Sequence, residues 1–110
     1  MANTFKNEVI DLTTSNQDLL AAAEVTGTGI VLTIRCTNVD GSSDATVDVE
    51  VVKASSGGNA YIAKTLSVPA DTTVELAGTS KIVLETGDKI QGLASAANDV
   101  EVFLSWLHIT

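Results

Sequence analysis

The sequence has 110 residues, a length that suits one domain, and 45% of them are hydrophobic while only 4% are aromatic. Its 14 acidic and 6 basic residues leave a net charge of −8. That charge argues against binding to nucleic acid or to an anionic membrane surface, because both need clustered lysine and arginine. Basic or neutral protein surfaces remain suitable partners.

The cysteine content and the first residues indicate the compartment in which the protein folds. A single cysteine, Cys36, cannot form a disulfide within the chain. The opening stretch, MANTFKNEVIDL, lacks the basic and apolar regions of a secretory signal. No apolar run approaches the roughly 20 residues of a membrane span. We therefore expect folding in a cytoplasm, without a secretion signal and without a membrane partner.

The first quarter of the chain contains one clear prediction and one ambiguity. Residues 1–12 form an N-terminal arm or an edge strand, with the strand running from about residue 4 to residue 12. Residues 17–25, QDLLAAAEV, suit either an extended segment or a short helix that Asp18 would cap. We favour the extended form because the segment is short and strands surround it.

The middle of the chain shows the clearest period-two alternation. In residues 30–36 one face is predicted to carry Ile30, Leu32, Ile34 and Cys36. In residues 45–51 the apolar face is predicted to carry Ala45, Val47, Val49 and Val51, opposite Thr46, Asp48 and Glu50. An Asp-Gly dipeptide at residues 40–41 predicts a turn between these two strands. SSGGN, residues 55–59, predicts a hairpin tip.

Shorter strands follow over residues 60–68, 73–76, 81–84 and 89–94. Gly87 supplies the positive φ of a hairpin turn, and residues 96–99 form a second turn. The last strand, residues 100–109, is apolar on both faces. One face carries Val100, Val102, Leu104 and Trp106, and the other carries Phe103, Leu107 and Ile109. Such a strand either lies centrally in a two-layer core or is covered by another chain.

These segments amount to about eight short strands, spaced roughly 8–12 residues apart. Helical periodicity is nearly absent. The sequence therefore predicts an all-β fold: a single domain over residues 1–110, built as an antiparallel β-sandwich or a jelly-roll-like small barrel.

Catalytic candidates are few. Cys36 and His108 are the only cysteine and histidine, and a nucleophilic Cys–His pair is conceivable. However, Cys36 is in phase with apolar residues, where a small buried side chain is expected, and His108 lies near the chain end, where solvent is usual. We therefore predict no catalytic residue, and a protein that is not an enzyme.

Acidic residues gather around the Asp-Gly turn, and oxygen-rich loops can hold calcium. The residues concerned are Asp40, Asp44, Asp48 and Glu50. Their spacing does not match a calcium-binding loop, and the last two lie on the exposed face of a strand. We therefore interpret them as a solvated acidic surface and predict neither a metal nor another cofactor.

Three segments resemble small structural proteins of tailed bacteriophages: NVDGSSDATVDVEVV, YIAKTLSVPADTTVEL and KIVLETGDKIQGLASAANDVEVFLSWLHI. The resemblance covers about residues 30–110. It implies a compact β-sandwich that is present in many copies in a virion and is assembled in the host cytoplasm. The implied role is a capsid decoration or cement protein that bridges capsomers. The alternatives are a tail, neck or fibre-attachment protein, and a sugar-binding host-adhesion module.

This function would require contacts with other virion proteins, such as the major capsid protein or tail and neck proteins, and with further copies of the chain. We expect these contacts to involve the N-terminal segment and the two-faced last strand. The predicted interface residues are Phe5, Val9, Ile10, Phe103, Trp106, Leu107 and Ile109.

Overall fold

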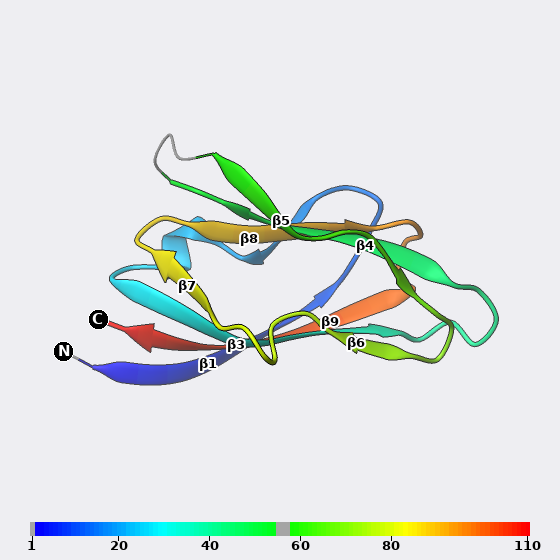
Figure 1. Cartoon of the computed structure of the whole chain (residues 1–110), viewed down its shortest axis with the longest axis horizontal. Coiled ribbons are helices and arrows are strands. Elements are labelled where there is room, and N and C mark those ends of the chain that lie inside the picture. The colour runs from blue at the N-terminus through cyan, green and yellow to red at the C-terminus, as the bar shows by residue number, and fades with distance from the viewer. Residues whose placement is uncertain (1, 55–57) are drawn as a thin grey trace.

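The computed structural model describes residues 2–54 and 58–110, which form nine strands in two antiparallel sheets packed face to face (Figure 1). This confirms the predicted all-β sandwich. The strands are β1 (Asn3–Asp11), β2 (Gln17–Leu20), β3 (Thr28–Asn38), β4 (Ala45–Val52), β5 (Asn59–Val68), β6 (Thr73–Glu75), β7 (Ile82–Glu85), β8 (Lys89–Ala94) and β9 (Val100–Ile109). Of the predicted hairpin tip at 55–59, residues 55–57 lie outside the described part.

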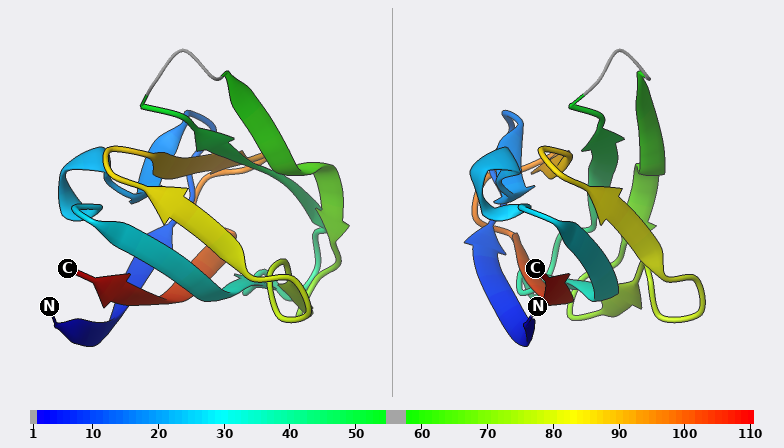
Figure 2. Two further views of the ribbon diagram at one scale, coloured as in Figure 1. Left: turned by 60° about the vertical axis from the view of Figure 1, so that its left-hand side comes forward. Right: turned by 90° about the vertical axis from the view of Figure 1, so that its left-hand side faces the viewer.

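The strands divide into two sheets, which we call sheet A and sheet B. In sheet A the order is β1-β9-β3, and β6 and β7 pair with different parts of the remaining edge of β3. In sheet B the order is β2-β8-β4-β5. β1 pairs with β9 along its whole length, from Asn3 opposite Ile109 to Asp11 opposite Glu101. The N-terminal segment is therefore an edge strand, and Figure 2 shows it along the outside of the molecule.

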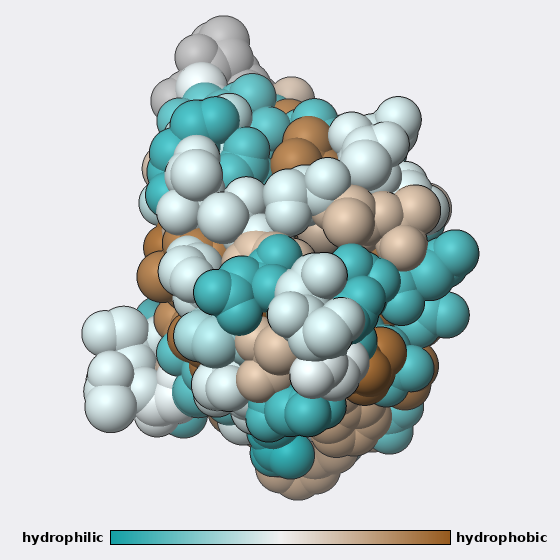
Figure 3. Space-filling model, turned by 90° about the vertical axis from the view of Figure 1, so that its right-hand side faces the viewer, coloured by the Kyte–Doolittle hydropathy of each residue, from teal (hydrophilic) through white to brown (hydrophobic). Residues whose placement is uncertain are grey.

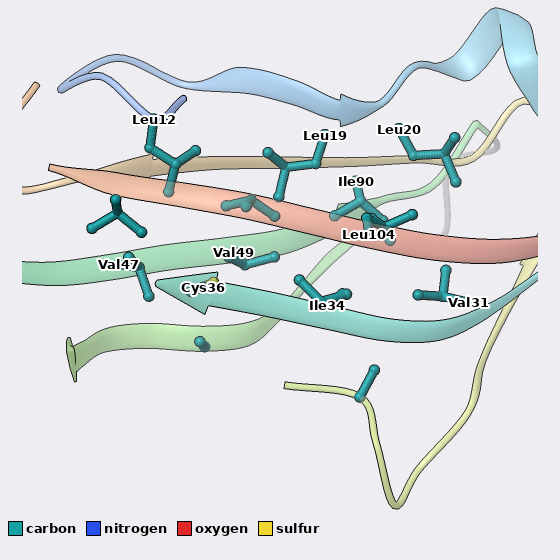
Figure 4. Packing of buried hydrophobic residues seen from close by; sticks show 14 of the residues in the cluster. Leu12, Leu19, Leu20, Val31, Ile34, Cys36, Val47, Val49, Ile90 and Leu104 are labelled. Carbon is teal, nitrogen blue, oxygen red and sulfur yellow. The ribbon is translucent and has the colours of Figure 1, made fainter. Parts of the chain in front are cut away.

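The hydrophobic core lies between the two sheets, where side chains from both layers interdigitate (Figure 4). β9 supplies Val100, Val102, Leu104 and Trp106, and β4 supplies Ala45, Val47 and Val49, all at most 2% exposed. These are the faces that alternation predicted to be apolar. Leu12, Leu19, Leu20 and Ile90 complete the part of the core near the β1–β2 connection.

β3 departs from the predicted alternation. A register shift between Val31 and Thr33 places an extra residue in the strand. Such a bulge reverses the side-chain phase. Val31 is therefore buried and Ile30 lies on the outer face of sheet A. The prediction that Ile30 shares a face with Ile34 and Cys36 is wrong for this reason.

Side chains stabilise β3 at this irregularity, which lies between the part of β3 that pairs with β7 and the part that pairs with β6. The Glu75 carboxylate accepts hydrogen bonds from the backbone N–H of Ile34 (2.8 Å) and of Ala77 (3.1 Å). Lys81 donates to the carbonyl oxygens of Leu32 and Gly78, both at 3.1 Å. These bonds replace the strand pairing that the backbone of β3 lacks here.

In the ambiguous segment at residues 17–25, the favoured extended form is confirmed for residues 17–20, which are strand β2. The alternative of a helix capped by Asp18 is wrong, because Asp18 lies within β2, and only a short 3-10 turn, η1 (Ala22–Glu24), follows. The predicted turns are confirmed: Gly87 has φ +84° between β7 and β8, and Asn98 has φ +65° between β8 and β9. Among the described residues, no helix has the length and apolar character needed to cross a bilayer.

Candidate protein interface

The outer face of sheet A, which points away from sheet B, carries a row of apolar side chains. Phe5 of β1 lies opposite Leu107 of β9, Leu107 lies opposite Ile30 of β3, and Ile30 lies opposite Val83 of β7. We call these four residues the outer row. Phe5 is 74% exposed and Val83 is 63% exposed. Four apolar residues in register across four strands form a continuous hydrophobic band on the surface.

A second apolar pair lies further along the same face. Val9 of β1 is 71% exposed and lies opposite Phe103 of β9. Arg35 of β3 lies opposite Phe103, with its guanidinium 5.9 Å from the ring centre. Arg35 also approaches Glu75 of β6 at 3.9 Å. The face therefore carries two apolar groups with the polar pair Asn7 and Ser105 between them, and both signs of charge beside Phe103.

Five of the seven predicted interface residues share this outer face: Phe5, Val9, Phe103, Leu107 and Ile109. The structure corrects the placement of the other two. Trp106 is completely buried, because alternation along β9 turns it into the core, so the prediction that it forms part of an interface is wrong. Ile10 likewise points inward and packs partly buried against the core.

Sequence reasoning missed two members of the outer row, Ile30 and Val83. Alternation places Ile30 on the inner face, because the bulge in β3 leaves no clear mark in the sequence. Val83 lies in a predicted strand, but the segment is too short for its alternation to indicate which face it occupies.

The outer face of sheet B has a different chemistry, because polar side chains on neighbouring strands pair with one another. Asp48 accepts hydrogen bonds from Lys64 Nζ (3.1 Å) and from the backbone N–H of Thr65 (2.7 Å). Gln91 donates to Glu50 at 2.6 Å. Lys89 pairs with Asp18 at 3.0 Å. Most of these groups already have partners within the chain.

Cys36 and His108 do not form a catalytic pair. Cys36 lies opposite Val102, whereas His108 lies opposite Gly29, so the two are about six residues, or roughly 20 Å, apart along β9. Cys36 is fully buried, and burial, with Glu75 nearby, raises the pKa of its thiol to about 12. A thiol in this state is a poor nucleophile at neutral pH.

The expectation that His108 is exposed to solvent is wrong. It is only 8% exposed, and its Nε2 donates to the carbonyl oxygen of Thr26 at 2.6 Å. The ring also lies 5.0 Å from that of Trp106. These contacts hold the end of β9 against the segment before β3, which is a structural role.

Two of the acidic residues around the Asp-Gly turn accept hydrogen bonds from backbone N–H groups and so stabilise the local chain. Asp40 accepts hydrogen bonds from the N–H groups of Ser42 and Ser43, which lowers the pKa of its carboxyl. Asp44 accepts from the N–H of Ala70 at 3.0 Å. Within residues 2–54 and 58–110, no cluster of three metal-binding side chains occurs.

The end of the molecule that carries these turns lies to the right in Figure 1, and Figure 3 views it directly. It is mostly hydrophilic or pale, with hydrophobic colour only in separate patches. No pocket is found in the part of the chain that the structure describes. The continuous apolar row on sheet A is therefore the surface feature that calls for a functional explanation.

Asp88, at the turn between β7 and β8, is a buried charged group with a structural role. It is 2% exposed and accepts hydrogen bonds from Lys53 Nζ (2.8 Å) and from the backbone N–H groups of Ala54 (3.0 Å) and Glu85 (2.9 Å). Burial by itself would raise the pKa of the carboxyl, but these donors outweigh it and lower the pKa below its usual value. The group ties the end of β4 to the turn.

Comparison with known proteins identifies the fold but no family. No family model and no curated protein matches the sequence. A solved structure from Bacillus endospore appendages, which are described as a novel family of disulfide-linked pili, is similar in fold. The match has a TM-score of 0.52 at 11% identity and covers 97% of this chain and 86% of that one. This similarity agrees with the two-sheet sandwich and is limited to the fold.

Proposed function

We propose that this chain is a non-enzymatic structural subunit of a protein assembly, and that it contacts its neighbours through the outer face of sheet A. The observation that carries the proposal is the outer row. A row of four in-register apolar residues, two of them more than 60% exposed, is costly to leave in water and typical of a surface that another protein covers. The paired polar groups of sheet B offer no comparable surface.

The assembly we propose is a bacteriophage virion, with the chain as a capsid decoration or cement protein. Support comes from the resemblance of residues 30–110 to small virion proteins and from the acidic charge of −8, which suits a protein made in many copies. A cement protein acts mechanically: it adds contact area to each joint between capsomers. The outer row provides such area on a small, rigid sandwich.

A tail, neck or fibre-attachment role would use the same surface, and the copy number per particle distinguishes it from the capsid role.

The sugar-binding alternative has less support. Its stacking surface would need exposed aromatic rings side by side, yet Tyr61 lies on sheet B, and Phe5 lies opposite Leu107, four residues along β9 from Phe103.

The pilus similarity indicates that a related sandwich can serve as a building block, although links by disulfides do not transfer to this chain. Its single cysteine is buried, with a thiol pKa of about 12. Contacts through the outer row would therefore be noncovalent.

The test is to purify virions from the strain that encodes the chain and to count its copies per particle on quantitative gels. A decoration protein is expected on the order of hundreds of copies, as the symmetry of a capsid requires. A few to dozens of copies would replace the capsid role with a tail role. Absence from purified particles would overturn the virion proposal.

A further inference from the structure

The free edge of β1 is the second unpartnered feature of sheet A. Among the described residues, β9 is the only strand that pairs with β1. Ala2 and Thr110 exchange both backbone hydrogen bonds, at 3.2 and 3.0 Å, and Leu12 donates to Val100. Bonded pairs alternate in an antiparallel ladder, so the even-numbered residues of β1 bond to β9. The N–H and C=O groups of the odd-numbered residues, Asn3 to Asp11, therefore point to the free edge.

An exposed edge of nine residues is long for a strand that stays unpaired. Two copies of its sequence, NTFKNEVID, are complementary when they run antiparallel with Asn7 of one copy opposite Asn7 of the other. In that antiparallel register Lys6 faces Glu8 of a second copy, and Phe5 faces Val9. Thr4 faces Ile10, and Asn3 faces Asp11.

We propose that two copies of the chain pair through β1, antiparallel and with Asn7 opposite Asn7, to form one continuous sheet. This proposal goes beyond the function argued above and does not depend on it.

Hydrogen-bond geometry supports the register. Residues directly opposite in an antiparallel pair either both point their backbone groups at each other or both point them away. With Asn7 at the centre, every odd-numbered residue of one copy faces an odd-numbered residue of the other. These five facing positions form about ten hydrogen bonds, and no residue of β1 overhangs.

Charge distinguishes this register from the neighbouring symmetric ones. Centring the pair on Lys6 would place two Lys6 ammonium groups opposite each other, and centring it on Glu8 would place two carboxylates opposite each other. Within residues 2–54 and 58–110, neither Lys6 nor Glu8 forms an ion pair. Charged side chains on the inner face of an edge strand hinder pairing with unrelated strands. Here they permit the register centred on Asn7 and disfavour the two centred on Lys6 and on Glu8.

The surroundings of Glu8 point the same way. Burial, and then the nearby carboxylate of Glu24, raise the pKa of Glu8 above its ordinary value, and the Trp106 side chain and Lys6 of the same chain offset this only in part. Lys6 of a second copy would add a further positive charge opposite the carboxylate.

Surface area gives a further reason for pairing. Four strands about 4.8 Å apart and about 30 Å long present roughly 550 Å² on the outer face of sheet A. A stable contact buries about 800 Å² on each partner. Pairing through β1 joins two such faces and places Phe5 of one outer row beside Val9 of the other copy. The combined outer face, with its apolar and polar residues together, is roughly 1,100 Å², which is large enough for a specific contact.

Cysteine cross-linking tests the register. In the proposed dimer the two copies of residue 7 lie about 5.5 Å apart at Cα, within disulfide range. Asn7→Cys is therefore expected to form a covalent dimer under mild oxidation. The matched control is Asn3→Cys, on the same strand and face, whose two copies would lie about 27 Å apart. The native Cys36 is buried and does not compete.

Charge reversal tests the pairing without a covalent bond. Lys6→Glu alone and Glu8→Lys alone each place like charges opposite each other and are expected to shift the chain toward monomer in sedimentation. Mixing the two variants restores opposite charges across the joint, so a heterodimer is expected to form. Melting curves of each variant show that folding is intact.

Three results would overturn the proposal: a wild-type chain that stays monomeric at all concentrations, Asn7→Cys that cross-links no better than Asn3→Cys, or a mixture that forms no heterodimer. None of them would affect the virion proposal, which copy number in particles decides. Conversely, absence from particles would leave the dimer in place.

Discussion

On the outer face of sheet B, Asp48 pairs with Lys64 and Gln91 pairs with Glu50, whereas the outer face of sheet A carries the outer row. Both faces belong to the same sandwich and cover the same core. Sheet B forms its polar contacts within the chain, while Phe5 and Val83 of sheet A remain largely in water. Folding alone does not account for exposed apolar residues in register, and this difference is the reason for proposing sheet A as the binding face.

The largest expected effect concerns the core side of β9. Leu104 is fully buried, and Leu104→Ala removes its side chain and leaves a cavity. We expect the free energy of unfolding to fall by about 2–5 kcal/mol, measured by denaturant titration. A loss below about 1 kcal/mol would show that the inner face of β9 is not the densely packed layer described above.

Asp88→Asn should have the next largest effect. The substitution keeps the size of the side chain but removes the negative charge that Lys53 faces. It also replaces one carboxylate oxygen by an NH2 group, so that the backbone N–H of either Ala54 or Glu85 loses its acceptor. We expect a loss of about 2–3 kcal/mol in the free energy of unfolding. An unchanged midpoint in urea would contradict the structural role of this group.

Acid should weaken the polar contacts of the sandwich. The pKa values of Asp48 and Asp88 lie below the ordinary value of 3.8 in the folded chain. A carboxyl with a lowered pKa contributes its full stability above the unfolded pKa and loses it as the pH falls through the folded pKa. The melting temperature should therefore drop below about pH 4. In Asp88→Asn this drop should be smaller, and an equal drop would exclude Asp88 as a cause.

The smallest expected effect lies on the outer row. Val83→Thr preserves the β-branched shape and the strand preference while removing apolar surface that is already 63% exposed. The free energy of unfolding should change by less than about 0.5 kcal/mol. A large loss would mean that the outer row stabilises the fold itself, and the contrast between the two outer faces would lose its functional meaning.

Alternation was enough to predict the fold class, the inner faces of β4 and β9 and the turn at Gly87, because these depend on local pattern and turn chemistry. It could not predict the composition of the outer row. The bulge at Leu32 reverses the phase of β3, and side-chain hydrogen bonds from Glu75 and Lys81 stabilise it from distant positions. His108 was misplaced for a similar reason, since its partner Thr26 lies far away in sequence.

The central claim is that the outer face of sheet A, and not that of sheet B, binds the neighbouring proteins of an assembly. The most direct measurement compares how two variants are incorporated into particles, Phe5→Ser on the outer row and Tyr61→Ser on sheet B. Both remove an exposed aromatic ring, 74% and 54% accessible respectively. We expect Phe5→Ser to lower incorporation at least tenfold, equivalent to about 1.4 kcal/mol of binding, while Tyr61→Ser stays at the wild-type level. Equal incorporation of the two variants, or a loss confined to Tyr61→Ser, would contradict it.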